Sequence, residues 1–140
     1  MIAYDTDDLQ NLALCAWKEA RGEGIEGMDA VMHVCVNRVG APGFGHTIHD
    51  VIFGKNQFTS MSVSSDPEFN LQPGDNDVMY SNAIAMAGTV LDGTETDPTH
   101  TAHYYADLKY TTSGWFFDHI VGDTVNHPQV AVIGRHTFYL

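Results

Sequence analysis

The segment Trp17-Lys18-Glu19-Ala20-Arg21-Gly22-Glu23-Gly24 is the point from which the rest of the chain is interpreted. It places one carboxylate, Glu19, near the end of a helical pattern and then interrupts that pattern with glycines, which favour helix ends. A second acid, Glu23, follows the interruption. The segment therefore predicts a helix end with two separated acids, of which Glu19 is our candidate for proton transfer.

Apolar residues recur at spacings of three and four before this segment, which predicts a helix with one inward face. The inward positions are Leu9, Leu12, Ala13, Ala16 and Ala20. Thr6, Asp7 or Asp8 is expected to cap the start of this helix. Glu19 lies at the edge of the inward face, so we expect its carboxyl to be partly withdrawn from water, which disfavours the charged form.

Further helices are expected at about residues 27–39, 48–53 and 75–91, where helical spacing returns. Gly22, Gly24 and Gly27 are expected to turn the chain before the first of these. The last is expected to bury Val78, Ala83, Ile84, Met86, Ala87 and Val90.

The segment from Ser60 to Gly74 lacks periodicity and predicts a long surface loop, a feature that is often functional. Residues 101–105 and 130–133 have the composition of short strands, and 134–139 form an extended aromatic run. The predicted fold class is α+β, mainly α, as a single domain over residues 1–140 with a small β element and long loops.

Composition places limits on partners. Apolar residues make up 44% of the 140 residues, which is typical of a globular protein. The net charge of −12 argues against binding nucleic acid, which needs clustered Lys and Arg. We expect no membrane insertion, since no apolar run reaches the roughly 18 residues of a membrane span. Residues 1–8 lack the basic and apolar regions of a signal peptide, so synthesis and default residence in a cytoplasm are expected.

The two cysteines, Cys15 and Cys35, both fall within apolar helical patterns. Without an export signal, buried free thiols are favoured over a disulfide between them.

Three kinds of chemistry can be weighed from the residues alone. Glu19 suits a general acid that protonates a glycosidic oxygen, because a helix end beside a cleft can hold a carboxyl in a fixed position. The alternative is that Glu19 and Glu23 are solvated helix-end residues paired with Lys18 or Arg21, and spacing alone favours this alternative.

A metal site is the second possibility, because the chain has eight histidines, with pairs at His46-x-x-His49 and His100-x-x-His103. Neither pair has the Glu or Cys partners of a zinc motif, so incidental histidines and no metal are expected. A thiol or hydroxyl nucleophile is the third. It is disfavoured, because both cysteines are expected in the core and no Gly-x-Ser-x-Gly motif is present.

Aromatic residues are numerous in the second half of the chain. They are Phe58, Tyr80, Tyr104, Tyr105, Tyr110, Trp115, Phe116, Phe117, Phe138 and Tyr139. Most are expected in the core. Some are interleaved with Gln57, His103, Asp107 and Ser113, a combination suited to a groove in which sugar rings stack on aromatic faces.

Taken together, these motifs resemble the SleB-type cell wall hydrolases, relatives of the spore cortex-lytic enzymes, from about Leu9 to Tyr139. The resemblance rests on the order and spacing of Glu19-Ala20-Arg21-Gly22-Glu23 with Gly27, Val36-Asn37-Arg38-Val39, Val51-Ile52-Phe53, Gln57-Phe58, Ala102-His103-Tyr104, Trp115, and Ile133-Gly134-Arg135-His136-Thr137-Phe138-Tyr139. It implies a lysozyme-like domain that cleaves peptidoglycan glycan strands between N-acetylmuramic acid and N-acetylglucosamine.

The same resemblance implies specific roles. Glu19 would be the catalytic residue of a lytic transglycosylase that uses no metal, no cofactor and no second carboxylate. Substrate binding would fall to Glu23, Gln57, Phe58, His103, Tyr104 and Trp115. This chain has His103-Tyr104-Tyr105-Ala106 where family members often have other residues, so the details of its sugar subsites are expected to differ.

Exported members of the family carry a leader and commonly a wall-binding module, neither of which is seen in these 140 residues. By analogy, the expected setting is a monomeric phage lysin that reaches the wall through a pore made by another protein. Three other functions stay open. They are a hydrolytic muramidase with Glu23, Asp107 or Asp118 as second carboxylate, a zinc-dependent amidase, and an inactive wall-binding module.

Overall fold

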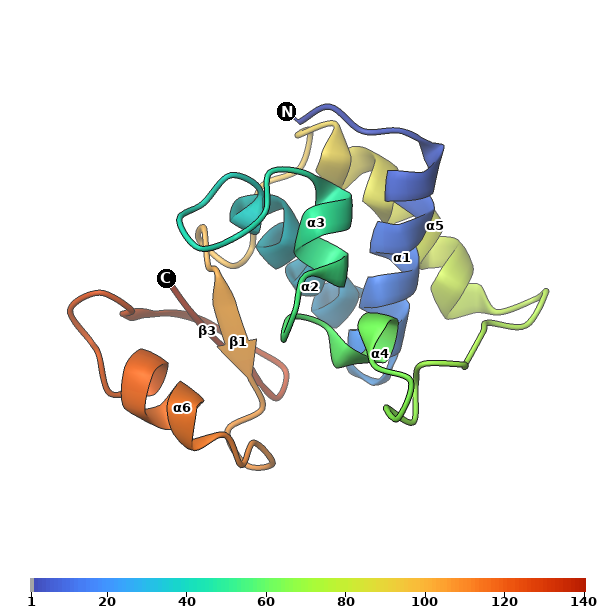
Figure 1. Ribbon diagram of the computed structural model, residues 1–140. Coiled ribbons are helices and arrows are strands. Elements are labelled where there is room, and N and C mark those ends of the chain that lie inside the picture. Colours follow the sequence, from blue (N-terminus) through green and yellow to red (C-terminus); the bar gives the residue numbers. More distant parts are fainter. Residues whose placement is uncertain (1) are drawn as a thin grey trace.

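Three helices, α1 (Thr6–Ala20), α2 (Gly24–Arg38) and α5 (Val78–Leu91), pack against one another and form the helical body in the computed structural model, which describes residues 2–140 (Figure 1). Two short helices, α3 (Ile48–Phe53) and α4 (Thr59–Ser62), pack against α1. Within residues 2–140, no helix is long and apolar enough to cross a membrane.

The C-terminal third forms a small sheet beside the helical body (Figure 1). Its strands are β1 (Tyr104–Ala106), β2 (Gln129–Ile133) and β3 (His136–Tyr139), which pair antiparallel in the order β1-β3-β2. A helical turn, α6 (Gly114–Phe116), and a π-helical turn, η2 (Phe117–Val121), lie between β1 and β2. The predicted mainly helical α+β fold is confirmed.

The start of α1 corrects one prediction. The N-cap is Asp5, whose carboxylate accepts a hydrogen bond from the Asp8 backbone N–H at 2.8 Å, while the Asp8 carboxylate accepts one from the Asp5 N–H at 3.1 Å. This is a capping box. The cap therefore lies one residue before Thr6, and Asp8 is its reciprocal partner rather than the cap itself. The predicted inward face is confirmed, since Leu12, Ala13, Ala16 and Ala20 are buried.

The junction between α1 and α2 corrects a second prediction. A 3₁₀ turn, η1 (Arg21–Glu23), joins the two helices, and α2 begins at Gly24, whose φ of +77° suits glycine. Gly27 does not turn the chain but lies inside α2. A Cβ at Gly27 would lie 2.3 Å from the Cβ of Glu23, so this glycine allows a close approach instead.

Two buried clusters hold the fold together. The larger one joins α1, α2, α3 and α5, and it includes both free cysteines, Cys15 and Cys35, as predicted. The smaller one packs Ala30 and Val34 of α2 against Ala102 and Phe138, so it attaches the sheet to the helical body. Because α2 contributes to both clusters, it links the two parts of the molecule.

The remaining elements agree with the sequence in part. The structure has α3 and α5 where helices were predicted, capped by Thr47 and Asp77. Val78 is 70% exposed, so its predicted burial is wrong: it is the first residue of α5 and precedes the packed turns. The predicted loop from Ser60 to Gly74 is irregular only after α4, in which Ser60 and Met61 are buried.

Candidate active site

The carboxylate of Glu19 lies where α1, α4 and β1 meet. Its Oε1 accepts a hydrogen bond from the Tyr105 hydroxyl at 2.8 Å, and its Oε2 accepts one from the Ser60 hydroxyl at 2.8 Å. Glu19 is half-buried at the last turn of α1. Both carboxylate oxygens are thus held by hydroxyl donors from segments far away in the sequence.

The Tyr105 side chain is itself held in place. Its ring stacks on Phe138 with centroids 5.6 Å apart and meets the edge of His136 at 5.1 Å. Burial, together with the neighbouring Glu19 charge, raises the pKa of Tyr105 well above its usual value. The phenol therefore stays protonated and can act as a steady hydrogen-bond donor.

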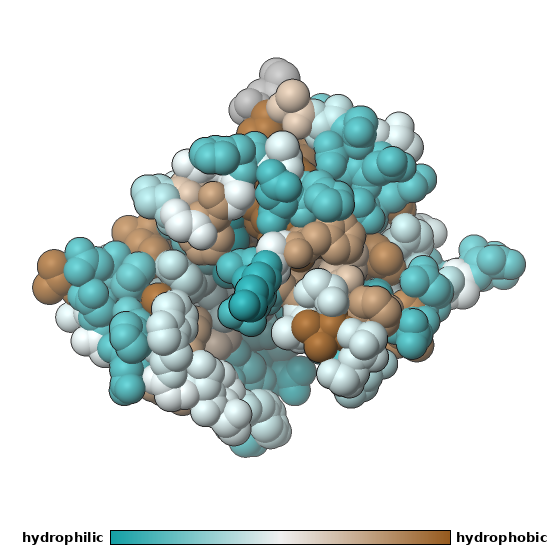
Figure 2. Space-filling model, viewed as in Figure 1, coloured by the Kyte–Doolittle hydropathy of each residue, from teal (hydrophilic) through white to brown (hydrophobic). Residues whose placement is uncertain are grey.

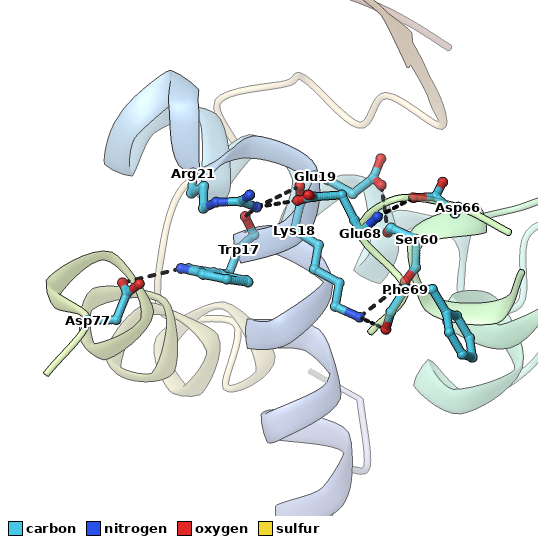
Figure 3. Close-up of polar contacts among 9 residues, drawn as sticks. All are labelled: Trp17, Lys18, Glu19, Arg21, Ser60, Asp66, Glu68, Phe69 and Asp77. Carbon is cyan, nitrogen blue, oxygen red and sulfur yellow. Dashed lines mark hydrogen bonds and ion pairs between the residues drawn. The ribbon is translucent and has the colours of Figure 1, made fainter. Parts of the chain in front are cut away.

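The basic residues beside Glu19 do not pair with it. Lys18 donates to the backbone carbonyls of Ser60 at 3.2 Å and Phe69 at 2.8 Å, and Arg21 forms an ion pair with Glu68 (Figure 3). Within residues 2–140, no ion pair involves Glu19. The solvated-pair interpretation of the segment is therefore wrong for Glu19.

Lys18 has a supporting function instead. It is 8% exposed, and burial lowers the pKa of its ammonium group. Its bond to the Ser60 carbonyl fixes the segment whose hydroxyl reaches Glu19. Arg21 adds to this support, because its guanidinium lies 4.3 Å from the centre of the Trp17 ring while pairing with Glu68 of the following loop.

Glu23 connects the helix junction to the sheet. The Arg135 Nε donates to Glu23 Oε1 at 2.7 Å and lies 3.8 Å from Asp107 Oδ2. The hydrogen bond from Arg135 lowers the pKa of Glu23. Glu23 therefore pairs with neither Arg21 nor Arg38, and its side chain does not cap α2.

His136 lies within this group of residues. Its Nδ1 is buried without a hydrogen-bond partner in the described part of the chain. Burial lowers the pKa of His136, against the opposing effect of the Glu23, Asp107 and Glu19 charges. Its imidazole is therefore neutral at neutral pH and packs as an aromatic ring against Tyr105.

A cavity of about 720 Å³ has Tyr105, the hydrogen-bond donor to Glu19, in its wall, whereas Glu19 itself is not among the residues that line it. The face of the molecule in Figure 2 is hollowed between the region of β1 and α6 and the region of α4. Aromatic and polar side chains line the cavity. The aromatic ones are Phe44, Tyr104, Tyr105, Trp115 and Phe116, and the polar ones are Arg38, Lys55, Asn56, Gln57, Thr111 and Ser113.

The cavity brings together three of the six predicted substrate-binding residues, Gln57, Tyr104 and Trp115. Phe58 is only 3% exposed and packs under Arg38, so it belongs to the core rather than to a sugar-binding surface. The His103 ring stacks on Phe44 at 6.2 Å and does not line the cavity.

Glu23 also lies outside the cavity lining. Of the other acids considered, Asp107 faces Arg135, and Asp118 is exposed on η2. Among residues 2–140, no three His, Cys, Asp or Glu side chains are grouped as a metal site would require.

Sequence reasoning did not single out Ser60, Tyr105, Arg38 or Lys55 as site residues. Tyr105 was visible as an aromatic residue in a predicted strand, but alternation in a strand does not say which of two adjacent tyrosines faces the helices. Ser60 carries no pattern of its own, because it lies in a single helical turn within a polar segment.

The chain belongs to the cell wall hydrolase family, whose model matches residues 22–139. The match begins three residues after Glu19. Similar proteins include the spore cortex-lytic enzymes of Oceanobacillus iheyensis, 33% identical over 96% of this chain, and of Bacillus subtilis, 30% identical over 96%. The chain spans only 42% and 38% of the lengths of these two relatives.

Two solved structures resemble the whole chain, Glu19 included. The catalytic domain of the germination-specific lytic transglycosylase SleB from Bacillus anthracis superposes with a TM-score of 0.75 at 30% identity, covering 100% of this chain and 99% of that one. The catalytic domain of the Bacillus cereus SleB protein gives 0.74 at 30% identity, covering 100% and 94%. These structures match the domain at full length, whereas the sequence relatives contain further residues.

Proposed function

We propose that this domain cleaves the glycan strands of peptidoglycan by lytic transglycosylation, with Glu19 as both acid and base. The observation that carries the proposal is the Glu19 carboxylate held by Ser60 and by Tyr105, which also lines the cavity. It is supported by the full-length likeness to the Bacillus anthracis catalytic domain, which is a lytic transglycosylase.

The reaction has two stages at one carboxyl group. In the first, protonated Glu19 donates its proton to the glycosidic oxygen between N-acetylmuramic acid and N-acetylglucosamine, so the C–O bond breaks and the N-acetylglucosamine hydroxyl leaves. In the second, the Glu19 carboxylate takes the proton of the muramic C6 hydroxyl, and the C6 oxygen forms a bond to the anomeric carbon of the same sugar. The product is a 1,6-anhydro end, and no water is consumed.

The two hydroxyl donors act on the second stage. Once Glu19 has given up its proton, Tyr105 and Ser60 stabilise the charged carboxylate and keep it aimed at the substrate. In the first stage Glu19 carries one proton, which it gives to the glycosidic oxygen, while its carboxyl oxygens keep lone pairs that can accept from the two hydroxyl groups. Tyr105 and Ser60 are thus positioning residues for the catalytic carboxyl group.

The cavity supplies a binding surface suited to sugars. Trp115 is 56% exposed and lines the cavity, while one side of its ring stacks on His119 at 5.3 Å with an interplanar angle of 13°. An indole backed in this way presents a firm apolar face to a pyranose ring. Gln57 and Ser113 add polar groups for sugar substituents.

A hydrolytic muramidase would need a second carboxylate free to activate water. Arg135 pairs with Glu23 and lowers its pKa, which weakens it as a base, and the same arginine lies 3.8 Å from Asp107. Asp118 is exposed on η2 and does not line the cavity. This arrangement favours transglycosylation as the reaction.

The test is product analysis of purified peptidoglycan by mass spectrometry, with Glu19→Gln as the control. We expect muropeptides ending in anhydromuramic acid from the wild type and none above background from Glu19→Gln. Reducing muramic ends would assign the hydrolytic reaction instead. Release of free amino groups that stops in EDTA would assign an amidase.

A further inference from the structure

We propose that the cavity binds a carboxylate group of the substrate through Arg38, with Lys55 as a second cation. The proposal rests on the proposed function, because it concerns how the same site recognises a peptidoglycan strand. It adds a recognised group and two residues that the family motif alone does not assign to substrate binding.

Arg38 is a buried cation without an anionic partner. It is 7% exposed, yet within residues 2–140 no carboxylate forms an ion pair with it. Its hydrogen bonds go to neutral oxygens, from Nε to the His103 carbonyl at 2.7 Å and from Nη1 to Gln57 Oε1 at 3.1 Å. Buried arginines are rarely left unpaired, because removing a charge from water is costly. The missing anion is therefore expected to come from a ligand.

Aromatic rings hold the Arg38 side chain in place. The guanidinium carbon lies 4.9 Å from the ring centre of Phe44, 5.2 Å from Phe58 and 5.9 Å from Tyr104. Such contacts stabilise a cation without neutralising it. Arg38 therefore keeps its full charge at the wall of the cavity, in a fixed orientation.

Donors remain available on this guanidinium. The two hydrogen bonds of Arg38 use Nε and Nη1, and Nη2 donates to no atom of the described residues. Nη2 has no hydrogen-bond partner among the described residues, but it is not fully buried, so it is open to solvent. Because Arg38 lines the cavity, Nη2 can donate to a carboxylate there. Gln57 accepts with its amide oxygen, which leaves its amide N–H groups free to join the same anion.

Lys55 adds a second positive charge. It lies in the turn before α4 next to Asn56, which has a φ of +63°, and both residues line the cavity. Within residues 2–140 Lys55 has no ion-pair partner either. The turn thus presents an exposed ammonium group toward the same space as Arg38.

The charge of the cavity is opposite to that of the chain. The protein has 18 acidic and 6 basic residues, yet two of the basic residues and no Asp or Glu line the cavity. Repulsion from distant surface acids is screened over about 8–10 Å at physiological salt, so the local cations decide what binds. Peptidoglycan offers carboxylates on the muramic lactyl group and on the stem peptide, and both share this chemistry.

Binding to a Glu19→Gln protein tests the proposal without turnover. Three ligands are compared by calorimetry: neutral chitotetraose, the alternating N-acetylglucosamine–N-acetylmuramic acid tetrasaccharide with free lactyl carboxylates, and the same tetrasaccharide bearing stem peptides. We expect at least one carboxylate ligand to bind about tenfold tighter than chitotetraose, a preference of about 1.4 kcal/mol. Preference for the unsubstituted tetrasaccharide assigns the lactyl carboxylate. Preference only with peptides present assigns a stem-peptide carboxylate.

Substitutions then locate the site. Lys55→Gln should reduce the preference several-fold, whereas Lys109→Gln, which changes an exposed lysine outside the cavity, should leave the preference unchanged. Arg38→Lys, checked for folding by circular dichroism, keeps the charge but removes the planar fork and should also reduce the preference. If Arg38→Lys does not fold, Lys55→Gln decides alone.

Equal affinity for acidic and neutral ligands overturns the proposal, and so does a preference that survives Lys55→Gln and a folded Arg38→Lys. The proposed function is judged separately by digestion with the wild type. Anhydro products without any carboxylate preference would reject the carboxylate site alone. A carboxylate preference without cleavage would reject the proposed reaction alone.

Discussion

The Tyr105 hydroxyl donates a hydrogen bond to Glu19 Oε1 across 86 residues of sequence, at 2.8 Å. This contact joins the sheet to the last turn of α1, so the position of the carboxylate depends on how the sheet packs against the helical body. Phe138 packs against both Tyr105 and α2, so it connects the tyrosine to the helical body.

Tyr105→Phe removes only the hydroxyl that contacts Glu19. We expect a fall in kcat of about 10- to 100-fold, since a hydrogen bond to a charged group contributes about 1.5–3 kcal/mol, with the fold retained. Turnover of purified peptidoglycan is the measurement. Tyr139→Phe is the matched control, because Tyr139 is a buried tyrosine of β3 whose hydroxyl makes no hydrogen bond to any of residues 2–140. Equal effects of the two substitutions would contradict a specific role for Tyr105.

Ser60→Ala removes the donor to Glu19 Oε2. We expect a loss of about tenfold in kcat with little change in KM, because the hydroxyl positions the carboxyl group and does not bind the sugar. Ser62→Ala is the control, since the Ser62 hydroxyl donates to the Phe58 carbonyl in the same short helix. Wild-type turnover in Ser60→Ala would show that Oε2 needs no donor.

Glu23→Gln weakens the link between the helix junction and the β2–β3 turn. We expect a moderate loss of turnover from this change, a similar loss from Arg135→Gln, and no further loss when both are combined, because the two residues act as one pair. Glu26→Gln, which changes an exposed acid in the first turn of α2, should have no effect. Additive losses in the double variant would argue that Glu23 acts independently of Arg135.

The same pair predicts a pH effect on stability. Because Arg135 lowers the pKa of Glu23, the pair stabilises the folded state above the ordinary carboxyl pKa, and this contribution is lost as pH falls through the lowered pKa. The difference in Tm between wild type and Glu23→Gln should therefore shrink as pH falls through that range. Thermal unfolding at a series of pH values measures it.

Gly27→Ala tests the corrected role of Gly27. The added Cβ would lie 2.3 Å from the Glu23 Cβ, so we expect a destabilisation of about 1–3 kcal/mol from overpacking and a displaced Glu23. Gly22→Ala is the control, because a Cβ there has no atom within 4 Å. Denaturant unfolding compares the two variants. A Gly27→Ala protein as stable as Gly22→Ala would contradict the close approach.

Local patterns were sufficient for much of the fold. Helical spacing located α3 and α5, and turn residues located the loops, because these signals act over a few residues. The Gly27 and Val78 predictions were wrong for a common reason. A glycine can serve a turn or a close approach, and an apolar residue at a helix start is buried only if another element covers it.

The site could be predicted only in part. The edge position of Glu19 follows from its place on α1, but its contacts to Ser60 and Tyr105 depend on tertiary packing that spacing does not encode. Phe58 shows the same limit, since its burial under Arg38 could not be read from the motif that contains it. Arg38 belongs to the motif Val36-Asn37-Arg38-Val39, but its lack of an anionic partner is visible only in three dimensions.

The most direct test of the central claim is mass spectrometry of peptidoglycan digested by wild type and by Glu19→Gln at equal concentration of folded protein. We predict anhydromuramic ends from the wild type and a loss of at least about a thousandfold in their rate of formation with Glu19→Gln, as expected when the acid/base group is removed. Wall cleavage by Glu19→Gln at the wild-type rate would contradict this prediction.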